Sequence, residues 1–253
     1  MTRILTRTFC LVLLSAAAVR AQTPEQLFQQ GNLMYQQGRL PEAREAYEGL
    51  LAAGYVAGDI YYNLGNTYYR TGDIGHAILN YERALRYIPG DEDLRHNLQL
   101  ANLLITDRIE AAPRLFFWDY WEGLKNAFSV NGASWLFVLT FFLVFASLVV
   151  VVLARRYRSK RLALAVTALG IVACALSLVL LVAKVSDFTR TDEGIVTTPI
   201  STVKNSPDEK ASDAFVLHTG VKVRVVDRVS EWLEIRLADG KVGWVEKKTV
   251  EMI

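Results

Sequence analysis

The sequence contains little cysteine and little histidine, and this scarcity excludes several kinds of site. Cys10 and Cys174 are the only cysteines among 253 residues, and both fall in strongly apolar segments. We therefore expect no disulfide in the folded domains, which must be stable through packing alone. The histidines His76, His96 and His218 lack the spacing of metal ligands, and we expect each to be a surface or turn residue. The sequence thus predicts no metal site and no cofactor.

Catalytic motifs are missing as well. The chain has no zinc-protease motif, no nucleophile elbow, no phosphate-binding loop and no glycine pattern of a dinucleotide-binding fold. A paired-carboxylate site stays open from the sequence, but most acidic residues fall at helix starts and on solvated faces. We therefore predict that the protein is not an enzyme.

Two long segments contain no charged residue. Residues 133–154 and residues 162–183 are each 22 residues long and strongly apolar. A helix needs about 20 apolar residues to cross the hydrocarbon core of a bilayer, so each segment predicts a transmembrane helix. The alternative is a pair of buried helices in a soluble core, although core helices of this length usually have a polar stripe.

Positive charge is concentrated between these two segments. Residues 155–161 carry five cations and no acid, whereas residues 22–112 carry twelve acids and seven Lys or Arg residues. Short loops rich in Lys and Arg stay in the cytoplasm, so both ends of the hairpin should face the outer side. The cations would meet anionic lipid, and we predict no nucleic-acid partner. The topology-determining residues are therefore Arg155, Arg156, Arg158, Lys160 and Arg161.

Residues 1–21 have the pattern of a secretory signal peptide. Arg3 and Arg7 precede a short apolar core, and Val19-Arg20-Ala21 is a small-x-small cleavage site. An uncleaved segment would also leave the following domain outside, so the predicted topology does not depend on cleavage.

Residues 113–132 are crowded with aromatic side chains. This segment starts at Pro113 and leads into the first apolar run. We interpret it as an amphipathic helix that lies in the membrane interface, with a plain linker as the alternative.

Residues 24–91 contain a repeat of 34 residues, which predicts paired helices. The second copy, with Tyr61-x-x-Leu64-Gly65-x-x-Tyr68 and Pro89, resembles a tetratricopeptide repeat. We predict repeats at 24–57 and 58–91, followed by a capping helix at 91–110, in a helical domain of residues 22–112. The matched pairs are Phe28 and Tyr62, Gly31 and Gly65, Asn32 and Asn66, Tyr35 and Tyr69, Gly38 and Gly72, Ala43 and Ala77, and Tyr47 and Tyr81.

The first helix of each repeat offers a stripe of side chains for binding. Spacings of four and then three residues place an aromatic residue, an Asn and a Tyr on one face. Tetratricopeptide stacks resemble one another in that this helix lines a concave groove. There an Asn side chain can both donate a hydrogen bond to a peptide backbone and accept one from it, and aromatic rings can cover the side chains of the peptide. The alternative is that the Tyr residues only pack and the Asn residues are helix surface. The predicted groove residues are Phe28, Asn32, Tyr35, Tyr62, Asn66 and Tyr69, with Arg70 and His96 as contacts for an acidic end.

After Lys184 the pattern changes from helix to strand. Short β-rich runs are separated by turn signals, and Asp239-Gly240 predicts a two-residue hairpin turn. Residues 190–253 should therefore form a small barrel of five or six strands. The run from Trp232 to Ile235 and the Gly243-Trp244-Val245 sequence resemble a bacterial SH3-type domain. Trp232 and Trp244 are candidate contacts for cell-wall sugar or stem peptide, although we expect Trp244 to lie in the core.

The order of these parts is similar to that of the BatE-type proteins of the Bacteroides aerotolerance family. The resemblance covers nearly the whole chain after residue 21 and is most specific at residues 59–89 and 91–101. It implies an inner-membrane protein that is periplasmic on both sides of its hairpin. It also implies partners, namely von Willebrand factor A-type membrane proteins and a MoxR-type ATPase, in a system linked to oxygen or envelope stress. It implies no catalytic residues.

The sequence thus predicts a multidomain protein with an all-α tetratricopeptide-repeat stack, a two-helix transmembrane hairpin and an all-β SH3-like barrel. We expect a membrane-anchored adaptor whose extracytoplasmic domains bind partner proteins. One alternative is a membrane protein that binds peptidoglycan through the SH3-like domain. Another is a sensor that signals through the basic loop, although seven residues give a cytoplasmic partner little to contact.

Overall fold

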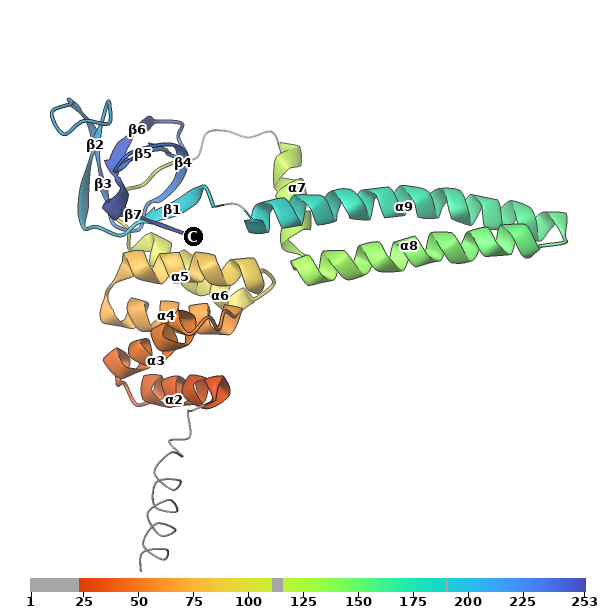
Figure 1. The fold of residues 1–253 in the computed structure, drawn as a ribbon, viewed down its shortest axis with the longest axis horizontal. Coiled ribbons are helices and arrows are strands. Elements are labelled where there is room, and N and C mark those ends of the chain that lie inside the picture. Colours follow the sequence, from red (N-terminus) through yellow and green to blue (C-terminus); the bar gives the residue numbers. More distant parts are fainter. Residues whose placement is uncertain (1–22, 111–115, 190) are drawn as a thin grey trace, which may run out of the picture. The chain divides into compact units, whose positions relative to one another are not determined.

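The structure is a computed structural model that describes residues 23–110, 116–189 and 191–253 (Figure 1). The chain divides into two compact units, Met1–Tyr55 and Val56–Ile253, which are described in turn. The predicted signal peptide, with its cysteine Cys10, and the start of the interfacial segment at Pro113 lie outside the described residues.

The first unit contains two helices that correspond to the first predicted repeat. Helix α2 (Pro24–Gln36) begins with a capping box between Thr23 and Gln26, and α3 (Leu40–Ala52) follows a tight turn. Gly31 lets the two helices approach, because a Cβ atom at this position would lie 2.8 Å from the Tyr47 ring. The first repeat therefore forms a helix pair even though its sequence is the more divergent.

The second unit begins with the second repeat and its capping helix. Helix α4 (Gly58–Thr71) ends at Gly72, whose φ of 83° is the left-handed conformation that glycine adopts most easily. Helix α5 (Ile74–Tyr87) stops just before Pro89, and Asp91 caps α6 (Glu92–Leu103) by accepting a hydrogen bond from the Leu94 backbone N–H. Helix α6 ends at Leu103, before the predicted residue 110, and Asp107 in the following segment contacts His218 of the C-terminal sheet.

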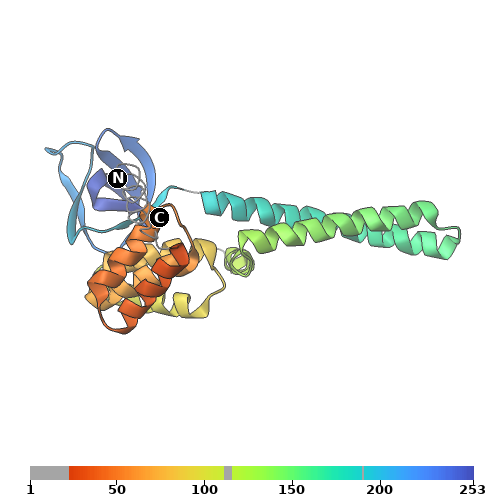
Figure 2. The ribbon, with the colours of Figure 1, turned by 60° about the horizontal axis from the view of Figure 1, so that its bottom comes forward.

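Three further helices follow. Helix α7 (Phe116–Asn126) lies in the predicted interfacial segment, and α8 (Val130–Leu153) and α9 (Tyr157–Thr189) form a long antiparallel hairpin (Figures 1 and 2). Both hairpin helices are long and apolar enough to cross a membrane. They are longer than the predicted segments 133–154 and 162–183, and α9 starts inside the predicted loop. No proline or glycine interrupts the chain between residue 157 and the apolar run, so the helix extends into the basic residues.

Small and hydroxyl side chains join the two long helices. Thr140 and Ser177 share a hydrogen bond of 2.9 Å, and a Cβ atom at Gly170 would lie 3.0 Å from Val144. The opposite surfaces are apolar and open: Val152 is 80% exposed and Leu169 is 72% exposed. An apolar surface of this extent needs apolar surroundings, which fits a bilayer and does not fit the core of a soluble protein.

Residues 193–252 form the β-domain, a seven-stranded antiparallel sheet in the order β3-β2-β6-β5-β4-β1-β7. Inward-facing Val, Leu and Ile side chains from these strands form one buried cluster. The hairpin turn lies at the predicted place but is one residue longer than the predicted two-residue turn: Leu237 pairs with Lys241, the Gly240 N–H donates to the Leu237 carbonyl, and Gly240 has a φ of 94°. The strands are β1 (Glu193–Val196), β2 (Ile200–Lys204), β3 (Asp213–His218), β4 (Lys222–Val229), β5 (Trp232–Arg236), β6 (Val242–Glu246) and β7 (Val250–Met252), with a short 3-10 helix, Lys247–Thr249, before the last.

The β-domain packs directly against the second repeat. Ile195 of β1 belongs to the same buried cluster as Ile78 of α5, and Ile105 and Ile253 pack against that cluster. Apolar contact therefore makes the second repeat and the β-domain parts of one compact unit, which the sequence pattern did not predict.

Candidate partner-binding surfaces

The predicted stripe on α2 is held in place by a buried tyrosine of α3. The Tyr47 hydroxyl donates a hydrogen bond of 2.7 Å to the Asn32 side-chain oxygen, and the Phe28 ring lies 6.0 Å from the Tyr47 ring. Burial raises the pKa of Tyr47, so this hydroxyl stays protonated and remains a donor. Phe28, Asn32 and Tyr35 are all partly exposed, as a binding stripe requires.

The second repeat contains the same arrangement. The Tyr81 hydroxyl donates to the Asn66 side-chain oxygen over 2.8 Å, and the Tyr62 ring lies 6.2 Å from the Tyr81 ring. Asn97 of α6 extends the network, because its side-chain amide donates to both Asn66 (2.9 Å) and the Tyr62 hydroxyl (3.1 Å). The 34-residue repeat thus carries a repeated tyrosine-to-asparagine hydrogen bond. Both residues were visible in the pattern, but their contact was not.

This network limits how the second stripe could bind a peptide. The Asn66 oxygen already accepts two hydrogen bonds, which is the usual capacity of an amide oxygen. A ligand would therefore meet the amide N–H groups of Asn66 as donors. Tyr69 is partly buried, while Arg70 lies exposed in the last turn of α4 and His96 lies exposed on α6. Peptide binding by these residues stays a prediction.

The two candidate tryptophans of the β-domain lie on its outer surface. In the antiparallel register Trp232 is opposite Glu246, and Trp244 is opposite Glu234. Burial alternates along β5 and β6, so Leu233, Ile235 and Val245 face the core while the two tryptophans and the two glutamates face outward. The expectation that Trp244 is a core residue is therefore wrong. Gly243 takes the inward position beside it, against Val203, where no side chain would fit.

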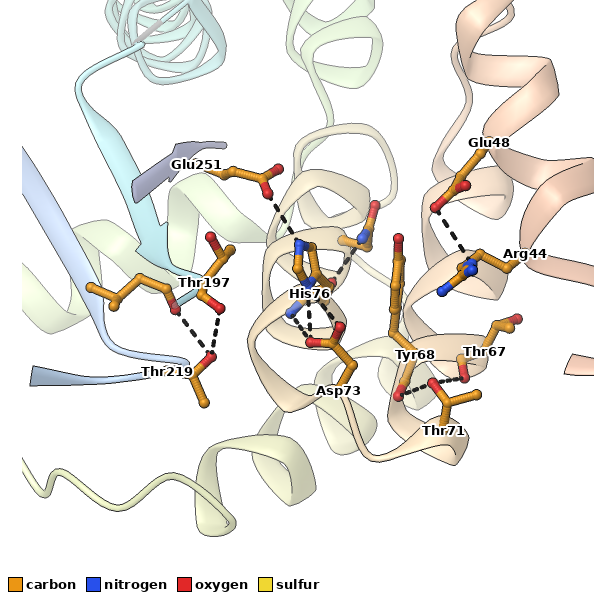
Figure 3. A network of polar contacts seen from close by, with 12 residues as sticks. Arg44, Glu48, Thr67, Tyr68, Thr71, Asp73, His76, Thr197, Thr219 and Glu251 are labelled. Carbon is orange, nitrogen blue, oxygen red and sulfur yellow. Dashed lines mark hydrogen bonds and ion pairs between the residues drawn. The ribbon is translucent and has the colours of Figure 1, made fainter. Parts of the chain in front are cut away.

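His76 is neither a surface residue nor a turn residue, contrary to expectation (Figure 3). It lies in the first turn of α5, where its ring Nδ1 is 2.8 Å from the Asp73 carboxylate and its Nε2 is 3.1 Å from Glu251 of β7. Its ring also stacks on Tyr68 at 5.1 Å. The hydrogen bonds to Glu251 and Asp73 together raise the pKa of His76 to about 9, against the effect of burial. A protonated histidine thus bridges the repeat and the sheet.

Three other polar contacts join the same two parts. Asp107 accepts a hydrogen bond from the His218 backbone N–H over 2.6 Å and lies 2.9 Å from its ring, so His218 is not a simple turn residue. Arg83 donates to the Met252 carbonyl, and Lys222 forms an ion pair of 3.0 Å with Glu82. Sequence reasoning missed this interface, because no local pattern pairs residues that are more than 100 positions apart.

Comparison with known families supports the assignment of the helical repeats and of the β-domain. A family model described as a tetratricopeptide repeat matches residues 28–92, and one described as a bacterial SH3 domain matches residues 202–251. The chain carries both kinds of domain. No curated protein matches it. Because the two domain types suggest binding of protein or peptidoglycan, the tetratricopeptide repeats and the SH3-like domain are the natural places to look for a partner site.

The basic cluster lies at the end of the hairpin that is formed by the two apolar helices. Arg155 and Arg156 lie between α8 and α9, while Arg158, Lys160 and Arg161 lie in the first turns of α9. All five side chains are exposed. The predicted loop of residues 155–161 is therefore shorter than expected, although its charges remain together where the chain reverses.

The His76 bridge predicts that the interface between the repeat and the SH3-like domain weakens at high pH. The folded-state pKa of about 9 exceeds the ordinary value of 6.5, so this stabilisation is complete below pH 6.5 and is lost as the pH rises through 9. We expect a loss of about 1 to 2 kcal/mol, because solvent screens the partly exposed carboxylates. Thermal unfolding between pH 6 and pH 9.5 measures it.

Two glutamine variants control for other groups that titrate in this range. His76→Gln should remove this part of the pH dependence, whereas His96→Gln, which changes an exposed histidine of α6, should keep it. Equal pH dependence in wild type and His76→Gln would show that the bridge contributes nothing.

Proposed function

We propose that the protein is a non-enzymatic adaptor, anchored in a membrane by α8 and α9, whose tetratricopeptide repeats and SH3-like domain bind partner proteins. The observation that carries this proposal is the repeated stripe on α2 and α4. In each stripe an aromatic residue, an Asn and a Tyr recur, and a buried tyrosine fixes the Asn side chain. Side chains fixed before binding lose little entropy when a ligand arrives, which favours recognition.

The proposed location is the inner membrane of a bacterium, with both folded domains outside the cytoplasm. The signal-like residues 1–21 and the basic cluster at residues 155–161 support this orientation. The resemblance to BatE-type proteins supports a finer proposal, in which the partners are von Willebrand factor A-type membrane proteins that act with a MoxR-type ATPase in aerotolerance or envelope stress.

A second candidate function is cell-wall binding through the SH3-like domain. The outward position of Trp232 and Trp244 favours it, because flat aromatic rings cover the apolar faces of sugars. Glu234 and Glu246 lie beside them on neighbouring strands and can accept hydrogen bonds from hydroxyl or amino groups.

One crosslinking experiment tests both candidates. The tagged full-length protein is crosslinked in native membranes and captured, and the bound material is analysed for proteins and for muropeptides released by muramidase. The groove variant is Tyr69→Ala with Arg70→Ala, the SH3-like variant is Trp232→Ala with Trp244→Ala, and Gln99→Ala on the exposed face of α6 is the control.

The adaptor proposal expects von Willebrand factor A-type proteins in the wild-type sample and a loss of about tenfold in the groove variant, as expected for one lost contact of about 1.4 kcal/mol. Unchanged recovery of proteins in the groove variant would contradict it. The cell-wall candidate expects muropeptides that disappear only in the SH3-like variant, and their absence from the wild-type sample would exclude it.

A further inference from the structure

A charged cavity of about 350 Å³ lies among α5, α7, α9 and the first and fourth strands, all within the second compact unit. Its charged side chains are five cations and four acids. Apolar side chains complete the wall. The charged residues are Arg86, Lys125, Lys184, Lys222 and Arg224, and Glu82, Glu122, Asp187 and Glu193; the apolar ones are Leu85, Val130, Phe188 and Ile253.

Ion pairs fix most of these charges in the wall. Lys125 of α7, only 8% exposed, lies 2.6 Å from Asp187 of α9 and 3.0 Å from Glu122. Burial alone would lower the pKa of Lys125, but its hydrogen bonds to Asp187 and Glu122 raise it, so the lysine stays charged. Lys125 is therefore shared between the carboxylates of Asp187 and Glu122.

The same holds on the side of the SH3-like domain. Lys222 of β4 lies 3.0 Å from both Glu82 and Glu193, and Arg224 lies 3.3 Å from Glu193. Against the pull of burial, the fields of Glu82 and Glu193 raise the pKa of Lys222. These contacts place Lys222 in the cavity wall between the repeat and the sheet.

Lys184 differs from the other lysines of the wall. Among the described residues it has no hydrogen bond and no ion pair, and the neighbouring acid Asp187 is already bound to Lys125. The ammonium group of Lys184 can therefore donate hydrogen bonds to an anion that enters the cavity.

The position of Lys184 indicates where that anion comes from. Lys184 directly follows the apolar run 162–183 of α9, at the level where a spanning helix leaves the hydrocarbon. Phe188, one turn further along α9, packs edge-on against Tyr87 of α5 at 5.4 Å and gives the cavity an apolar side. A phospholipid offers both features, because a charged phosphodiester adjoins its glycerol and acyl chains.

We propose that this cavity binds the phosphodiester headgroup of an anionic phospholipid, and that Lys184 contacts the phosphate. The inference rests on the membrane anchoring proposed above and is independent of the adaptor role. A lipid bound here contacts α9, the second repeat and the SH3-like domain together, and so ties the folded domains to the bilayer surface.

The test uses the full chain in nanodiscs that contain either phosphatidylglycerol or phosphatidylcholine. Native mass spectrometry counts the lipids that stay bound after release from the disc. Wild type should retain phosphatidylglycerol, and Lys184→Gln should lower its retention about tenfold, because one charge-assisted hydrogen bond is worth at least that factor. Lys184→Arg should retain it. Lys160→Gln, at the opposite end of α9, controls for general attraction between cations and anionic lipid.

Three outcomes would overturn the proposal. The first is equal retention of phosphatidylcholine and phosphatidylglycerol, and the second is an equal loss in Lys184→Gln and Lys160→Gln. The third concerns free phosphate. In phosphatidylcholine nanodiscs, inorganic phosphate should not raise the melting temperature of wild type. A rise as large as the one that phosphatidylglycerol nanodiscs give would show that the ligand is a soluble anion. Failure of the chain to enter nanodiscs would contradict the anchoring itself, which distinguishes the two failures.

Discussion

In intact spheroplasts, a maleimide that cannot cross the membrane should label a cysteine at Ser206→Cys fully and a cysteine at Ser159→Cys not at all. Ser206 is exposed in the SH3-like domain, and Ser159 is exposed among the cations in the first turn of α9. The two variants are made in a chain that carries Cys10→Ser and Cys174→Ser. Permeabilised spheroplasts should label both, which controls for reactivity.

The expected effect is all-or-none because of the five cations at residues 155–161. Moving each Arg or Lys through the centre of a bilayer costs about 2.5 to 3.5 kcal/mol on insertion scales, so the cluster opposes translocation by more than about 10 kcal/mol. Replacing all five with Gln should remove this barrier and give a mixture of orientations, with partial labelling at both positions. The opposite pattern in the unmodified loop would place both domains in the cytoplasm, away from the partners proposed here.

Gly65→Val should unfold the second repeat, and it is the single substitution from which we expect the largest loss of stability. A Cβ atom at Gly65 would lie 2.6 Å from the Tyr81 ring and 3.3 Å from the Ala77 carbonyl oxygen. Tyr81 has no exposed surface and its hydroxyl is bound to Asn66, so the ring cannot move aside. We expect a loss of about 3 kcal/mol or more, because overpacked cores must shift backbone to relieve such contacts.

Gly49→Ala provides the matched control. Gly49 also lies inside a repeat helix, α3, but apart from its chain neighbours and the backbone of its own helix no described atom lies within 4 Å of a Cβ atom at this position. Alanine should stabilise that helix by about 0.5 to 1 kcal/mol, since glycine is the poorer helix former. Thermal unfolding followed by circular dichroism measures both changes. A melting temperature of Gly65→Val close to that of wild type would show that α4 and α5 do not approach as described.

Much of the fold could be predicted because its signals are local. The 34-residue repeat predicted the helix pairs α2–α3 and α4–α5, and the two uncharged runs predicted α8 and α9. These features follow from turn residues and from apolar patterns at the period of the element itself. The stripes on α2 and α4 were predicted in the same way, as residues that share one helix face.

Other features were missed because they depend on which strands pair and on which face of a strand meets the core. The prediction of five or six strands fell short of seven, since β7 has only three residues and is a strand through its pairing with β1. The outward position of Trp244 depends on which face of β6 meets the core, and the Gly243 contact with Val203 decides it. A glycine in a strand gave no sign of this before its neighbour was known.

The sequence by itself determined that this protein has repeated helix pairs, a hairpin of two apolar helices and a C-terminal sheet, because composition and spacing act over a few residues. Only the tertiary structure decided that the sheet packs on α5, that His76 meets Glu251, and that Lys184 lines a cavity without an ion pair among the described residues. Such contacts join residues far apart in the chain, and their existence depends on how whole elements pack, which no fixed spacing records.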